Sequence, residues 1–114
     1  MPTSTTTASV YDYLRAHEAR IAAELIDFAA IPSVSTDPAY ADGMAAAAAW
    51  VAAQLTRAGM DHVQILPTAR HPVVYADWLH APGAPTLLVY GHYDVQPPDP
   101  LDAWASPPFA PEVR

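Results

Sequence analysis

The chain has 114 residues, of which 52% are hydrophobic and 15% are charged, and its formal net charge is −7. A chain of this length forms one modest domain, and its composition is neither that of a disordered segment nor that of a membrane-spanning chain. The five basic residues are all arginines scattered along the sequence. This argues against nucleic-acid binding, which draws its affinity from clustered cations. Cysteine is absent, so any metal would have to bind His, Asp or Glu side chains.

The amino terminus lacks the basic start and apolar core of a secretion signal. Residues 1–8 are polar and rich in threonine, and we expect a loose tail there. No apolar stretch approaches the roughly 20 residues that a transmembrane helix needs. The sequence therefore predicts a cytoplasmic protein without a membrane partner.

The first predicted helix begins with the capping pattern of Ser9 and Asp12 and ends before Pro32. Its apolar side recurs at spacings of three and four, which indicates an amphipathic helix that packs on a core. The residues of this stripe are Val10, Leu14, His17, Ile21, Leu25 and Phe28.

The second predicted helix begins with Asp37 as N-cap and Pro38 in the first turn, and it ends at Gly59. An alanine run in its middle favours the helix and permits close approach to another element. The stripe expected to be buried comprises Met44, Ala48, Val51, Leu55 and Ala58.

Three strands are predicted to follow the helices. Residues 62–66 and 73–79 are separated by a short connection, which favours an antiparallel pair. Residues 87–90 read LLVY, an apolar run without alternation that is typical of a strand covered on both faces. This order of elements predicts an α/β fold in which helices flank a mixed sheet.

Residues 97–114 contain six prolines, which exclude a regular helix and a central strand. Trp104 and Phe109 could attach this segment to the rest of the protein, whereas Asp99 and Asp102 should face water. We expect the segment to lead into a further portion of the protein after residue 114.

His92 and Asp94 form the candidate site. They directly follow the apolar run, at the carboxyl end of the predicted strand, where ligands of α/β sheets usually bind. Residues two apart in extended backbone point to the same side, so Asp94 can orient the His92 imidazole as a metal ligand. A surface histidine beside a turn aspartate is the alternative interpretation.

The remaining histidines are weaker candidates. His17 lies beside the helical stripe and is expected to be half-buried, whereas His62, His71 and His80 border predicted turns and are expected to be solvated. Asp77 is also expected to face water.

The sequence around this pair resembles the M20 metallopeptidases, and most closely their dipeptidase, carnosinase-like branch. Residues 88–97 read LVYGHYDVQP, and residues 102–109 read DAWASPPF, which is similar to the first metal motif of the family and the segment after it. Residues 31–35, IPSVS, resemble the opening of the family. The resemblance covers nearly the whole chain.

The resemblance implies a hydrolase of the zinc-exopeptidase fold that binds two zinc ions, with cobalt or manganese as alternatives. It would cleave the amide bond of dipeptides or N-acyl amino acids and would form a homo-oligomer, a dimer. His92 would bind one metal, and Asp94 would act in the active site by holding the His92 ring. In the family, the general base and the other ligands come later in the sequence.

Residues 1–114 would then be the amino-terminal part of the catalytic domain and inactive alone, because a catalytic zinc normally has three protein ligands. Two alternatives remain: a non-catalytic α/β module that assembles through an open sheet edge, and an inactive remnant. The isolated chain is expected to self-associate.

Overall fold

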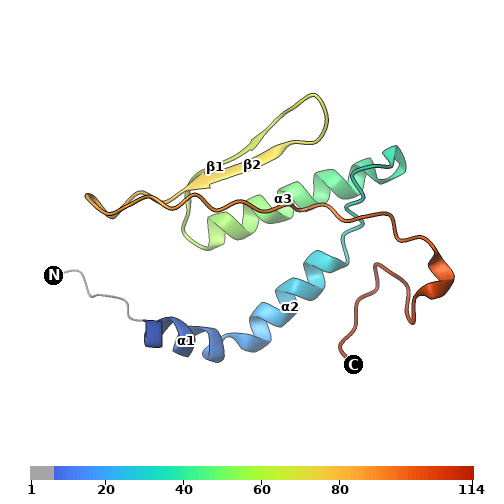
Figure 1. Ribbon diagram of the computed structural model, residues 1–114, viewed down its shortest axis with the longest axis horizontal. Helices are drawn as coiled ribbons and strands as arrows, with labels where there is room; N and C mark the ends of the chain where they lie inside the picture. Colours follow the sequence, from blue (N-terminus) through green and yellow to red (C-terminus); the bar gives the residue numbers. More distant parts are fainter. Residues whose placement is uncertain (1–6) are drawn as a thin grey trace.

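The computed structural model describes residues 7–114 and is arranged around helix α3 (Ala41–Arg57) (Figure 1). The predicted N-cap Asp37 caps the short 3-10 helix η1 (Pro38–Tyr40) that leads into α3, because its carboxylate accepts the Ala39 N–H at 2.9 Å. The α-helix itself begins four residues later, at Ala41. At the other end Gly59 adopts φ +83°, and the Met60 N–H bonds to the Leu55 carbonyl at 3.1 Å. This is the Schellman arrangement, so the predicted end at Gly59 is confirmed.

The core lies where α3 meets the connection that precedes it. Its fully buried members are Ser33, Val34, Gly43, Met44, Ala47 and Ala48. The predicted stripe of α3 is thus confirmed for Met44 and Ala48 and half-buried at Val51 and Leu55, but Ala58 is exposed.

Strands β1 (Asp61–Leu66) and β2 (Val73–Asp77) form the predicted antiparallel pair, which packs on α3 (Figure 1). The register shifts between Asp61 and Gln64, where His62 has a φ of +50°. The second strand ends at Asp77, two residues before the predicted end.

The first predicted helix is two helices, α1 (Thr7–Ala16) and α2 (Glu18–Ala29). The interruption is at His17, with φ −117° and ψ 14°, whose Nδ1 donates to the Tyr13 carbonyl at 2.8 Å. Because α1 begins at Thr7, the predicted start at Ser9 is wrong, and so is the loose tail at residues 7 and 8. The rest of that tail, residues 1–6, lies outside the described residues.

The apolar stripe of these two helices is not buried as predicted. Val10, Leu14, Ile21 and Leu25 are 37–66% exposed, because no described element covers them. The end of α2 packs on α3 through an aromatic contact, in which the Phe28 ring stacks on Trp50 at 4.6 Å. His17 is half-buried, as expected.

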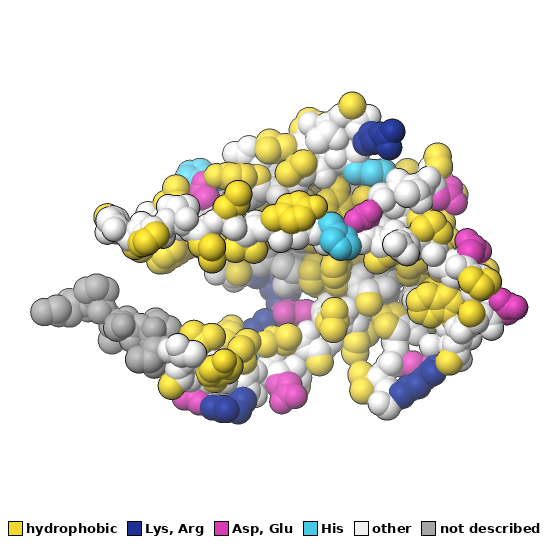
Figure 2. All heavy atoms as spheres, viewed as in Figure 1, with side chains coloured by type: hydrophobic (Ala, Val, Ile, Leu, Met, Phe, Trp, Pro, Cys, Tyr) yellow, Lys and Arg dark blue, Asp and Glu magenta, His cyan; other side chains and the backbone are white. Residues whose placement is uncertain are grey.

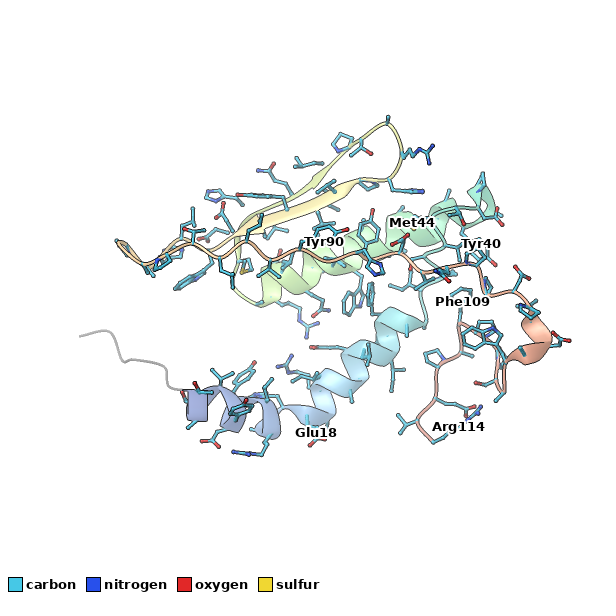
Figure 3. The ribbon with its side chains drawn as sticks, in the orientation of Figure 1. Glu18, Tyr40, Met44, Tyr90, Phe109 and Arg114 are labelled. Carbon is cyan, nitrogen blue, oxygen red and sulfur yellow. The ribbon has the colours of Figure 1, made fainter. Side chains whose placement is uncertain are left out.

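The predicted strand at residues 87–90 is extended but unpaired within residues 7–114 (Figure 3). Its four side chains are 80–90% exposed, so the prediction of a strand covered on both faces is wrong for this chain as it stands. A strand forms by pairing with neighbours, and the sheet described here comprises only β1 and β2. Just beyond the run, Val95 makes an isolated parallel bridge with Val34.

The proline-rich segment contains one short 3-10 helix, η2 (Leu101–Ala103). Its Phe109 ring lies 6.1 Å from that of Tyr40, which attaches the segment to the start of α3, as expected (Figure 3). Trp104 instead donates to the Pro98 carbonyl within the segment, at 2.7 Å. Asp99 and Asp102 are exposed as expected. Among residues 7–114, no helix is long and apolar enough to cross a bilayer.

Candidate metal site

His92 and Asp94 lie together just after the extended run 87–90. Nδ1 of His92 is 2.9 Å from Oδ1 of Asp94, and the two side chains are 73% and 37% exposed. Extended backbone places residues two apart on one side, so the predicted proximity of the pair is confirmed.

The partners of His92 determine which ring nitrogen carries the proton. Nδ1 also lies 3.0 Å from the main-chain oxygen of Asp94. A carbonyl oxygen and a carboxylate oxygen can only accept, so Nδ1 is the protonated nitrogen. In the neutral imidazole, Nε2 then carries the lone pair, as a metal ligand requires.

Ser35 holds the other oxygen of the same carboxylate. Its Oγ donates to Oδ2 of Asp94 at 2.5 Å. This hydrogen bond is the main reason why the pKa of Asp94 lies below its ordinary value, and the hydrogen bond from His92 lowers it further. Asp94 is thus an ionised acceptor held from two sides.

The surroundings fix Ser35 in turn. Ser33 and Val34 are 2% and 0% exposed, and the Val95 N–H bonds to the Ser33 carbonyl at 2.9 Å. Nε2 of His71 donates to the Ser35 carbonyl at 2.7 Å. The buried connection between α2 and η1 therefore holds Ser35 in place beside Asp94.

Sequence reasoning missed the roles of Ser35 and His71. They lie 59 and 36 residues from their partners Asp94 and Ser35, and no local spacing signals such contacts. Only the family resemblance links segment 31–35, which contains Ser35, to function. The prediction that His71 is solvated is wrong, since it is half-buried in this contact.

The other histidines remain apart from this site. His62 and His80 are exposed as predicted, and each pairs with an aspartate of the hairpin, His62 with Asp77 and His80 with Asp61. Asp77 is only 17% exposed, so the expectation that it faces water is wrong. Among residues 7–114, no three His, Asp or Glu side chains converge to hold a metal ion. The donor set fits one ligand of a metal centre and requires others from elsewhere.

Comparison with known proteins places the chain in a family. The chain is 38% identical over 89 residues to succinyl-diaminopimelate desuccinylase of Xylella fastidiosa, covering 77% of the chain. It is 39% identical over 85 residues, 73% of the chain, to the enzyme of the same name from Stenotrophomonas maltophilia. A solved structure of the dipeptidase Dug1p from Saccharomyces cerevisiae superposes on 95% of the chain with a TM-score of 0.84 and 27% identity. The chain belongs to the M20 metallopeptidase family.

The M20 relatives are much longer than this chain. The chain spans 21% and 20% of the two desuccinylases and 25% of the yeast dipeptidase. No protein-family model matches it. The structural match confirms the predicted α/β class with flanking helices, and the M20 relatives are hydrolases by name.

Proposed function

We propose that the chain is the amino-terminal part of a metal-dependent hydrolase that cleaves the amide bond of dipeptides or N-acyl amino acids. His92 would be a ligand of one of two metal ions, and Asp94 would hold its ring. The observation that carries the proposal is the His92–Asp94 pair, with Nδ1 protonated against two acceptors and Nε2 free to bind.

Zinc is the metal that the family resemblance favours, with cobalt and manganese as alternatives. A bound ion of this kind polarises the scissile carbonyl and lowers the pKa of a bound water. The contribution of this chain is narrower: Nε2 of His92 supplies one ligand, and Asp94 fixes its direction. Because no three His, Asp or Glu side chains of the described residues converge to hold a metal ion, the general base and the remaining ligands would come from further protein.

The substrate class follows from what the relatives act on by name. Two are desuccinylases of succinyl-diaminopimelate, and the solved neighbour is a dipeptidase. Both names describe hydrolysis of an amide bond next to an amino acid. We therefore propose this bond as the target and leave the acyl group to experiment.

The test is hydrolysis by the full-length gene product, loaded in turn with zinc, cobalt and manganese. The panel should contain unsubstituted dipeptides, N-succinyl amino acids and N-acetyl amino acids. We expect metal-dependent cleavage of one class, a loss of at least about 100-fold in kcat/KM for His92→Ala, and no turnover by residues 1–114 alone. Full-length protein that binds metal but cleaves none of the panel would contradict the proposed reaction.

A non-catalytic assembly module is the second candidate, and the exposure of residues 87–90 favours it. An unpaired extended segment can accept a strand from another chain. The two candidates differ in the role of His92: substitution to alanine should abolish hydrolysis but leave strand-mediated association unchanged. We also propose that the full-length enzyme is a homodimer, which sedimentation of that protein would test.

A further inference from the structure

We infer that Ser35 is a positioning residue for His92 and acts through the carboxylate of Asp94. This inference rests on the proposed function, in which Nε2 of His92 binds metal. It gives the buried connection between α2 and η1 a role in the metal site, although this connection is far in sequence from His92.

An aspartate alone would hold the His92 ring poorly. The His92 side chain is 73% exposed, and rotation about the Cβ–Cγ bond of an aspartate can turn either carboxylate oxygen away from its partner. Ser35 removes that freedom, because its Oγ binds Oδ2 at 2.5 Å while Oδ1 accepts from His92 at 2.9 Å. With each oxygen engaged on a different side, the carboxylate has one orientation.

The position of Ser35 is fixed by several independent contacts. The preceding residue, Val34, is fully buried and bridges to Val95, which is the neighbour of Asp94. Nε2 of His71 holds the Ser35 carbonyl at 2.7 Å, and the Tyr93 hydroxyl donates to the Pro72 carbonyl at 2.6 Å. The β1–β2 connection, the α2–η1 connection and the His92 segment thus meet at Ser35.

The consequence concerns the tautomer of the imidazole. Oriented acceptors at Nδ1 keep the proton there and leave Nε2 unprotonated. Without the serine hydroxyl, the Asp94 carboxylate can rotate away and leave the Asp94 main-chain oxygen as the acceptor at Nδ1. The population of the Nε2–H tautomer, which cannot bind metal through Nε2, should then increase. Ser35 therefore prepares the ligand before any metal arrives.

The test compares Ser35→Thr with Ser35→Val in the chain of residues 1–114. Threonine and valine have nearly the same shape, but only threonine keeps the hydroxyl. The readout is the imidazole ¹⁵N spectrum in alkaline buffer, where histidine is neutral. We expect the threonine variant to keep the wild-type Nδ1–H signature of His92 and the valine variant to shift toward Nε2–H. Equal His92 spectra in the wild type and both variants would overturn the inference.

Two controls separate positioning from damage to the fold. His71 contacts the main chain of Ser35, so its ¹⁵N signals should be unchanged in both variants if the connection is intact. Ser35→Ala also removes the hydroxyl but adds no branch, and it replaces valine in the comparison if the His71 signals change.

A second readout uses the full-length protein and zinc alone. We expect zinc affinity to fall about tenfold in Ser35→Val relative to Ser35→Thr, as for other groups that orient a metal-bound histidine. Equal affinities would count against Ser35. Absence of zinc binding in the unmodified protein would instead overturn the proposed function, and the ¹⁵N comparison would still decide the role of Ser35.

Discussion

Asp77 is the most heavily engaged charged side chain on the β hairpin. It accepts from Nδ1 of His62 at 2.8 Å and from the Tyr75 hydroxyl at 2.9 Å. The hydrogen bond from His62 is the main cause of the lowered pKa of Asp77. The same bonds raise the pKa of His62 and that of Tyr75, since each donor is held in its protonated form.

These shifts predict a pH window for the His62–Asp77 contribution to stability. Because the pKa of His62 is raised, the contribution is complete below its ordinary value of 6.5 and is lost as the pH rises through the folded-state pKa. Because the pKa of Asp77 is lowered, the contribution is complete above its ordinary value of 3.8 and is lost as the pH falls through the folded-state pKa. The pair should therefore stabilise the hairpin most between about pH 4 and 6.5.

Asp77→Asn tests this window through His62. We expect the pKa of His62, followed by NMR titration, to fall in the variant, because the hydrogen bond and the charge of Asp77 are its largest causes of a raised pKa. An unchanged titration curve of His62 would show that Asp77 does not stabilise the protonated form of His62.

At the scale of single residues, the sequence allowed prediction of contacts that local geometry dictates. His92 and Asp94 are two residues apart, and extended backbone alone brings them together. Ser35 and Asp94 are 59 residues apart, so their contact depends on the tertiary fold. The half-buried state of His71 and the hydrogen bonds of Asp77 also depend on the tertiary fold, so local sequence patterns did not predict them.

At the scale of elements, α3 and the hairpin were predictable because their determinants are local. Asp37, Pro38 and Gly59 set the ends of the helical region through their own backbone and side-chain chemistry. The exposure of α1 and α2 and the unpaired run 87–90 were not predictable in this way. An apolar stripe indicates what a segment can bury, but not whether the chain at hand supplies the surface that covers it.

Close packing of α3 against the preceding connection depends on Gly43. A Cβ atom at this position would lie 2.0 Å from the carbonyl oxygen of Pro32, far inside van der Waals contact. Gly43→Ala should therefore destabilise the protein by about 1–3 kcal/mol, although alanine is the better helix former by about 1 kcal/mol. Urea unfolding followed by circular dichroism measures the change.

Gly91→Ala is the matched control for this prediction. An added Cβ at Gly91 meets nothing within 4 Å, so we expect a change within about 0.5 kcal/mol. Equal unfolding midpoints for the two variants would mean that α3 does not pack against Pro32 as described.

At the scale of the whole molecule, the chain exposes more surface than a compact protein of its mass. Its accessible area is 9001 Å², against about 6,100 Å² for a folded monomer of this size. Its radius of gyration is 17.2 Å, against about 13 Å for a compact domain. Figure 2 shows hydrophobic side chains spread across the visible face. The excess of accessible area is larger than the area that each partner buries in a stable protein interface.

The extended run 87–90 is the part of this surface where the proposed function makes the sharpest prediction. Leu88 is 90% exposed in the chain. In the proposed full-length enzyme, further strands would cover it. Replacing Leu88 by a charged residue should therefore affect the stability of the two proteins to very different extents.

In residues 1–114 alone, Leu88→Asp should change the free energy of unfolding by no more than about 0.5 kcal/mol. It should reduce self-association in sedimentation experiments, because it places a charge on the exposed apolar edge. In the full-length protein the carboxylate would be buried without a partner, so we expect a loss of about 3 kcal/mol or more. Leu88→Ile keeps the apolar character and should leave both proteins nearly unchanged. If Leu88→Asp were harmless in the full-length protein, Leu88 would lie on its surface, and the run 87–90 would not be a covered strand of the enzyme.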